Sequence, residues 1–125
     1  MSISSSNPSA INHYNIAFNL HNRQKDFQGS INHLNKAISL DSNYAKAYNN
    51  RGNSYWQLGF YDKAMVDYDK AIEVAPTFAD AYNNKGIVLL NQGNINLGKE
   101  YINKAYELDP NDSDIIMSKR HCDTI

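Results

Sequence analysis

Amide side chains line one face of a predicted helix in the middle of the chain. Asn50, Asn53 and Gln57 share this face with Lys46, because positions three or four residues apart return to the same side of a helix. An asparagine amide offers two hydrogen-bond donors and an acceptor on a short stem, which suits bridging to the N–H and C=O groups of an extended peptide. The chemistry that these residues can do is therefore hydrogen bonding to a partner's backbone.

The same face recurs 34 residues further along the chain, where its members are Asp80, Asn84, Ile87 and Asn91. Asn50 and Asn84 stand at equivalent places, 34 residues apart. The candidate set for a peptide-binding groove is completed by Asn19, Asn49, Asn83 and Trp56. Two plainer readings stay open. The asparagines could be a solvated face in an asparagine-rich chain, and Trp56 could pack on a neighbouring helix.

An internal repeat positions these residues. Shifting the sequence by 34 residues aligns 47–76 with 81–110, and it brings Gly52 onto Gly86. A fixed period of this length is typical of stacked supersecondary units, none of which can bury its apolar face alone. The candidate residues are therefore presented by a repeated scaffold.

The spacing of apolar residues predicts three pairs of helices and one final helix. The predicted ranges are about 10–23, 27–38, 44–58, 61–75, 78–92, 95–108 and 112–121. Gly59 and Gly93 can adopt the left-handed conformation that ends a helix, and the short turns that follow require antiparallel pairs. Thr77 and Asn111 are each followed three residues later by an aspartate, which predicts that they cap the next helices.

Small and large residues alternate on the faces that pair the helices. Gly52 lies between Tyr48 and Tyr55 on one helix face, so a neighbouring helix can approach closely while the rings fill the space on either side. Gly98 stands in the place of Ala64 and indicates a close helix contact in the third repeat. The predicted repeat core consists of Tyr48, Gly52, Tyr55, Ala64, Tyr68, Ala71, Pro76, Tyr82, Gly86, Leu89, Ala105 and Pro110.

The first repeat is irregular. Phe18 falls where the later repeats have the glycine between the rings, and Lys25 falls where they have the turn glycine. Moving the first helix by one residue would give Ala17 the small position, at the cost of a turn that is one residue longer. Both frames stay open on the sequence alone.

These residues at these spacings resemble the tetratricopeptide repeat, whose 34-residue unit follows the pattern W-x₂-L-G-x₂-Y, then A-x₃-F, then P. The resemblance covers about residues 10–121 and is strongest in the second and third repeats. It implies a right-handed α-solenoid of three antiparallel helix pairs with a C-terminal capping helix, whose first helices line a concave groove. It also implies a role in binding proteins rather than in catalysis.

Members of this family that hold chaperone C-terminal tails use a two-carboxylate clamp made of lysine, asparagine and arginine. In the unshifted frame its asparagines fall on Asn19 and Asn50, whereas its cations fall on Asn15, Asp80 and Asn84. Neutral amides and a carboxylate cannot replace charge-assisted contacts to two carboxylates. The resemblance therefore disfavours a co-chaperone of that kind.

Composition argues against several other classes. Twelve Lys plus Arg against thirteen Asp plus Glu leave no basic excess for nucleic acid or an anionic membrane surface, and no apolar run is long enough to span a bilayer. Cys122 is the single cysteine and no histidine pair shares a helix face with a carboxylate, so neither a disulfide nor a metal site is expected. No cofactor loop or catalytic motif appears, so we expect a non-enzymatic, cytoplasmic protein without cofactors.

We expect a flexible tail at 1–9, one repeat domain at 10–121 and a short tail at 122–125. The repeats are placed at 11–44, 45–78 and 79–112, with a cap at 112–121. The favoured function is an adaptor or scaffold, monomeric or weakly homo-oligomeric, that binds an extended peptide of a partner protein. The alternative is a self-assembling subunit that pairs through the first repeat or through Ile115, Ile116 and Met117. The chain could also be part of a longer repeat array.

Overall fold

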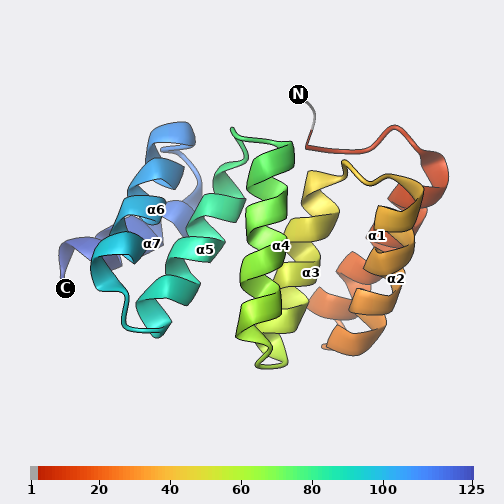
Figure 1. Cartoon of the computed structure of the whole chain (residues 1–125), viewed down its shortest axis with the longest axis horizontal. Coiled ribbons are helices and arrows are strands. Elements are labelled where there is room, and N and C mark those ends of the chain that lie inside the picture. The colour runs from red at the N-terminus through yellow and green to blue at the C-terminus, as the bar shows by residue number, and fades with distance from the viewer. Residues whose placement is uncertain (1–2) are drawn as a thin grey trace. The chain divides into compact units, whose positions relative to one another are not determined.

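The computed structural model describes residues 3–125, and these form α-helices without any strand (Figure 1). The helices are α1 (Pro8–Asn22), α2 (Phe27–Leu40), α3 (Ala45–Gln57), α4 (Tyr61–Val74), α5 (Ala79–Asn91), α6 (Ile95–Leu108) and α7 (Ser113–Asp123). Every one lies within two residues of its predicted bounds, so the predicted all-α fold is confirmed. No helix in this described range is long and apolar enough to cross a membrane.

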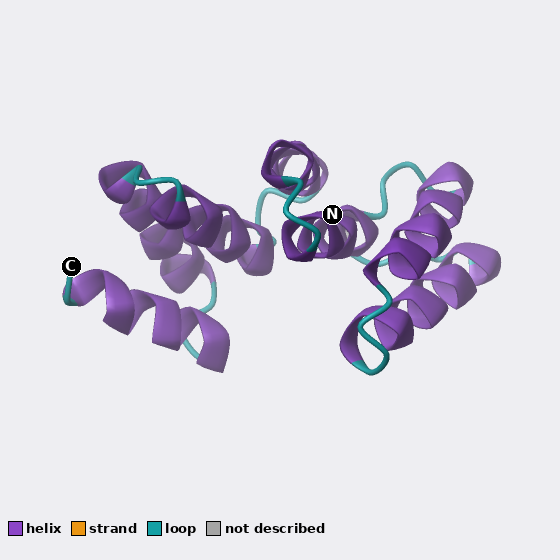
Figure 2. Ribbon diagram, turned by 90° about the horizontal axis from the view of Figure 1, so that it is seen from below, coloured by secondary structure: helices purple, strands orange, loops and turns teal. Residues whose placement is uncertain are grey.

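The chain divides into two compact units, one ending at Ala75 and the other beginning at Pro76. In the first unit α1 packs on α2, α2 on α3, and α3 on α4. In the second unit α6 packs on both α5 and α7. Figure 2 shows the helices of each pair joined by short turns. The expectation of a single domain over 10–121 stays a prediction.

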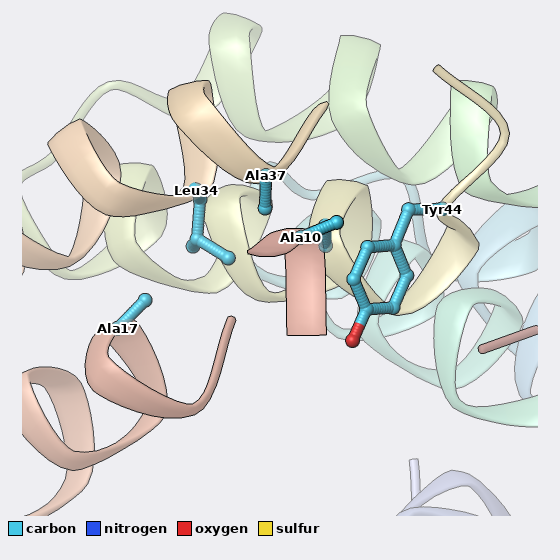
Figure 3. Close-up of a cluster of buried hydrophobic side chains, with 6 residues drawn as sticks. Ala10, Ala17, Leu34, Ala37 and Tyr44 are labelled. Atoms are coloured by element: carbon cyan, nitrogen blue, oxygen red, sulfur yellow. The ribbon is translucent and has the colours of Figure 1, made fainter. Parts of the chain in front are cut away.

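The core of the first helix pair is built from small residues around one large one. Ala10 and Ala17 on α1 lie across from Leu34 and Ala37 on α2, as Figure 3 shows, and all four are fully buried. Tyr44, at the start of α3, closes the cluster together with Ala47. Alanine methyl groups let two helices approach closely, so α1 and α2 are held at a fixed separation.

Glycine stands where the paired helices come closest. A Cβ atom on Gly52 would lie 2.8 Å from Cε1 of Tyr68, and one on Gly86 would lie 2.6 Å from Cγ1 of Ile102 and 2.9 Å from the carbonyl oxygen of Gly98. All three distances are shorter than the contacts that real Cβ atoms make, so a side chain at either position would force its neighbours to shift. The close helix contact predicted at Gly98 is confirmed, because a Cβ there would meet the carbonyl oxygen of Gly86 at 3.0 Å.

Most of the predicted repeat core is inside the protein. Tyr48, Ala64, Tyr68, Ala71, Leu89 and Ala105 are buried, and Tyr55 and Tyr82 are half-buried. Pro76 and Pro110 are exposed and are therefore not core residues, which corrects their placement. They follow α4 and α6 by two residues, where proline cannot continue a helix.

The structure resolves the frame of the first repeat. Ala17 is fully buried whereas Phe18 is 48% exposed, so the helix is shifted by one residue and Ala17 takes the small position. The turn between α1 and α2 is correspondingly longer than the turn between α3 and α4. Lys25 has a φ of 55°, close to the 83° of Gly59 and the 86° of Gly93. A lysine thus occupies a conformation that side chains disfavour.

The predicted helix caps at Thr77 and Asn111 are wrong. α5 follows Phe78, whose side chain makes no capping bond, and α7 is capped by Asp112, whose carboxylate accepts hydrogen bonds from the backbone of Asp114 and Ile115. A side chain directly before the helix reaches the unpaired N–H groups of the first turn better than one further away.

Both expected tails are more ordered than predicted over their described residues. The carbonyl oxygen of Ile3 accepts a hydrogen bond from the backbone N–H of Lys46 at 3.0 Å, and Ser5 Oγ donates to Asp41 Oδ2 at 2.5 Å. α3 has no side-chain cap, so Ile3 satisfies one of its unpaired N–H groups. At the other end α7 runs to Asp123 and buries Cys122.

Candidate functional site

The amide face of α3 is a narrow strip. α3 packs against α2 and α4 on its flanks, which leaves Lys46, Asn50 and Asn53 half-buried and Gln57 exposed. Asn49 lies on a flank and is only 4% exposed, so its inclusion in the groove set is wrong. Side chains on either side of the strip are buried by helix packing, because α3 has α2 on one flank and α4 on the other.

Two amides of the strip are held in place by tyrosines. Asn50 Nδ2 donates to Tyr14 Oη at 3.0 Å, and Tyr68 Oη donates to Asn53 Oδ1 at 2.6 Å. The bond to Tyr68 leaves the Nδ2 group of Asn53 without a hydrogen bond among the described residues. Burial raises the pKa of Tyr68, so this hydroxyl stays protonated and remains the donor. The amide of Asn53 is thereby oriented with its N–H donors unused.

α1 continues the face in the shifted frame. Asn15, Phe18 and Asn22 take the places that Asn50, Asn53 and Gln57 have on α3, and all three are exposed. We call these six residues the outward strip of the first unit. Asn19 takes the place of Ser54 but, unlike Ser54, it is exposed, and it lies four residues after Asn15, so its inclusion in the candidate set stays a prediction. The sequence in its unshifted frame could not distinguish Phe18 from a core residue.

α5 carries the corresponding residues of the second unit. Asp80 and Asn91 are exposed, and Asn84 and Ile87 are half-buried. Asn91 Nδ2 donates to the carbonyl oxygen of Ile87 in its own helix. Asn83 is 4% exposed, as Asn49 is, and its Oδ1 has no hydrogen-bond partner among the described residues, so it too leaves the groove set.

Trp56 packs on its own helix pair. Its ring centroid lies 4.8 Å from that of Tyr61, the first residue of α4, with the planes inclined by 51°. The indole is half-buried. Of the two alternatives left open by the sequence, contact with a neighbouring helix is therefore the one observed.

An ion pair that sequence reasoning missed fixes α3 against α4. Arg51 donates to both carboxylate oxygens of Asp67, and its Nη1 also donates to Asn35 Oδ1 on α2 at 2.9 Å. Burial raises the pKa of Asp67, and the hydrogen bond from Arg51 works against that rise. The available signal was the spacing of 16 residues, which recurs in the hydrogen bond from Lys85 to Tyr101.

The chemistry of the site is recognition by hydrogen bonds and apolar contact. Among residues 3–125 no three His, Cys, Asp or Glu side chains converge as metal ligands would. Burial raises the pKa of the Cys122 thiol, which favours the unreactive protonated form. The outward strip instead combines amides with the half-exposed ring of Phe18.

Comparison with protein families decides which family this scaffold represents. Models of the tetratricopeptide repeat match residues 45–78 and 67–100, and a further model of the same repeat matches residues 19–59. The chain belongs to the tetratricopeptide repeat family. Comparison of the sequence with curated proteins finds no match.

Solved structures with the tetratricopeptide repeat fold align with almost the whole chain. The first such domain of Spaghetti (RPAP3), bound to the HSP90 peptide SRMEEVD, is 18% identical with a TM-score of 0.85, and the alignment covers 98% of this chain and 97% of that one. The tetratricopeptide repeat domain of Arabidopsis OM64 is 17% identical with a TM-score of 0.85 over 93% and 95% of the two chains.

A third similar structure is the second tetratricopeptide repeat domain of human RPAP3, in complex with the HSP70 peptide SGPTIEEVD. It is 18% identical with a TM-score of 0.80, over 92% of this chain and 95% of that one. At this level of identity the likeness concerns the fold: three repeats followed by a C-terminal helix.

Proposed function

We propose that this chain is a non-enzymatic protein-interaction module whose outward strip holds an extended segment of a partner protein. The observation that carries the proposal is the composition of that strip. Asn53 presents unused N–H donors in a fixed orientation, and Phe18 on the neighbouring helix α1 exposes about half of its surface. Oriented amides suit a peptide backbone, and an exposed ring suits an apolar side chain.

The partner segment is expected to be uncharged or apolar rather than a double carboxylate. Two of the similar structures hold peptides that end in EEVD. In the resolved frame the clamp positions on α1 move from Asn15 and Asn19 to Tyr14 and Phe18. The clamp's lysine and asparagine are thus replaced by two rings, which lie with centroids 6.5 Å apart and planes inclined by 35°. Rings cannot give the charge-assisted contacts that carboxylates need.

A peptide-display selection on the immobilised chain tests this specificity. We expect the selected peptides to share an apolar or aromatic residue and to bind equally well with a free or an amidated C-terminus. Selection of peptides that need a C-terminal acidic pair would overturn the proposed chemistry.

Substitutions then test the place of binding. Asn15→Ala with Gln57→Ala, and separately Phe18→Ala, should weaken the selected peptides about tenfold, which corresponds to about 1.4 kcal/mol. Asn32→Ala on α2, also exposed and in the same unit, is the matched control. Unchanged affinity in both of the first two variants would remove the outward strip from the proposal, and the Asn32→Ala control should keep its affinity. Exposed substitutions usually change stability by less than about 0.5 kcal/mol, so melting should report intact folding.

The alternative of self-assembly through α7 loses its apolar patch. Ile115 is fully buried in a cluster with Ala79 and Ala105, so it cannot face a second copy. Ile116 is half-buried, and only Met117 is largely exposed, at 67%. One exposed methionine is ordinary on a protein surface. Self-assembly through α7 is therefore disfavoured, and pairing through the first repeat stays the alternative to peptide binding.

A further inference from the structure

Two histidines face each other across the first helix pair, away from the outward strip. His13 on α1 and His33 on α2 bring their Nδ1 atoms to 3.0 Å, with ring centroids 5.3 Å apart and planes inclined by 31°. We propose that this pair is a chelating site for a divalent transition-metal ion of the nickel or copper class. Imidazole nitrogen is a preferred ligand of these ions.

The separation of the two nitrogens matches the span of two neighbouring positions around such an ion. Metal–imidazole bonds are about 2.0–2.1 Å long. Two such bonds at a right angle place the nitrogens about 2.9 Å apart, whereas a tetrahedral angle places them about 3.4 Å apart. The observed 3.0 Å therefore fits the right-angled geometry of Ni²⁺ or Cu²⁺ better than the tetrahedral geometry of Zn²⁺.

The ligands are held by a rigid pair of helices. Ala10 and Ala17 on α1 and Leu34 and Ala37 on α2 are fully buried in one cluster, so the two backbones that carry the histidines have a fixed separation. Both rings are half-buried. A chelating pair that is already in place loses little conformational entropy when the ion arrives.

The change at the nitrogens is a change of tautomer. In the neutral pair one Nδ1–H donates to the lone pair of the other Nδ1. When the ion enters, that proton moves to Nε2 of the same ring through solvent, and each Nδ1 gives its lone pair to the metal.

The protein supplies two ligands to the ion, and the other coordination positions are open to solvent. No third His, Cys, Asp or Glu within residues 3–125 completes it, so water fills the other positions of the ion. The bound ion would tie α1 to α2. A search for ligands along one helix misses this pair, because its members come from two helices that only the fold brings together.

Calorimetric titration of the full chain with NiCl₂ at pH 7.5 tests the site. We expect one ion per chain, and at least tenfold weaker binding in His13→Ala and in His33→Ala, because each keeps only one ligand. His121→Ala is the matched control, since this exposed histidine stands beside the lone cysteine. It should bind Ni²⁺ as the wild type does. Circular dichroism checks that every variant is folded.

A second measurement separates chelation from a change in folding. On addition of substoichiometric paramagnetic Cu²⁺ to ¹⁵N-labelled protein, the ring resonances of His13 and His33 should broaden together, and more than those of His121. The proposal is overturned if Ni²⁺ binds His13→Ala and His33→Ala as tightly as the wild type, if only His121→Ala loses binding, or if Cu²⁺ leaves the ring resonances of both His13 and His33 unbroadened.

Discussion

Arg51 on α3 holds Asp67 on α4 through two hydrogen bonds, from Nε to Oδ2 at 2.9 Å and from Nη2 to Oδ1 at 2.7 Å. The Asp67 side chain is only 3% exposed, so its charge depends on this guanidinium. At the equivalent place of the third repeat Lys85 Nζ donates to Tyr101 Oη at 3.0 Å. The second and third repeats thus both join their two helices by a polar side-chain contact at the same position, although the residues that make the contact differ.

Arg51→Ala should lower the free energy of unfolding by about 3 kcal/mol, because it leaves a buried carboxylate without its partner. The double variant Arg51→Lys with Asp67→Tyr places the Lys–Tyr pair of the third repeat in the second repeat. Its loss of unfolding free energy should be smaller than the sum of the losses in the two single variants, by at least about 0.5 kcal/mol. Urea denaturation of the four proteins measures this coupling. Strictly additive losses of stability would show that the Lys–Tyr contact cannot replace the Arg–Asp contact in the second repeat.

The hydrogen bond from Tyr68 to Asn53 separates stability from binding. Asn53→Ala should cost about 1–3 kcal/mol, because it leaves the hydroxyl of Tyr68, a residue only 1% exposed, without its acceptor. Adding Tyr68→Phe removes that hydroxyl and should restore most of the stability. Thermal denaturation compares the two. If the double variant is folded and still binds peptide with full affinity, the Asn53 amide is not part of the site.

Substitution of the helix-contact glycines should be graded by what the new Cβ meets. Gly86→Ala places it against backbone, 2.9 Å from the carbonyl oxygen of Gly98, whereas Gly52→Ala meets mainly the ring of Tyr68. We expect losses of about 1–3 kcal/mol, larger for Gly86→Ala because backbone yields less than a side chain. Asn103→Ala, at an exposed position of α6, is the control and should be nearly neutral. Equal stability of the glycine variants and the control would contradict the close packing.

Exchanging lysine and glycine at the two left-handed turn positions should change stability in opposite directions. Lys25→Gly should stabilise the protein by about 1 kcal/mol, because it relieves a side chain held at φ 55°. Gly59→Lys puts the same strain into the next turn and should lower the stability by about the same amount. A Cβ there would meet open space, so the φ of 83° is the only unfavourable factor. Chemical denaturation measures both, and effects of the same sign would contradict this account.

His21 should make stability depend on pH. Its Nδ1 lies 2.7 Å from Ser54 Oγ, and burial, with a smaller contribution from Lys25, lowers its pKa. The unfolded chain then binds more protons than the folded one below about pH 6.5, so stability should fall as the pH drops through that range. His21→Asn should flatten this fall and His121→Asn should not. Urea denaturation at pH 7.5 and 5.5 measures the fall in stability of the wild type and of each variant. If the His21 ring is freely accessible to solvent, the wild type and His21→Asn should show the same fall.

Local pattern predicted the helices well. Apolar spacing placed each helix within two residues of its bounds, and the turn glycines marked the helix ends, because periodicity and backbone sterics are properties of a short segment. The caps were predicted less well. Phe78 precedes α5 without a capping side chain, so capping chemistry alone could not locate that boundary.

By itself the sequence determined the repeat, the helix-contact glycines and the side of α3 that carries amides, since each of these follows from spacing along one chain. Only the tertiary structure decided between Ala17 and Phe18, buried Asn49 and Asn83, and joined His13 to His33. The physical reason is that exposure depends on what packs beside a helix. α3 has neighbours on both flanks, so a residue only slightly off the outward strip is enclosed, and no periodicity within α3 records this.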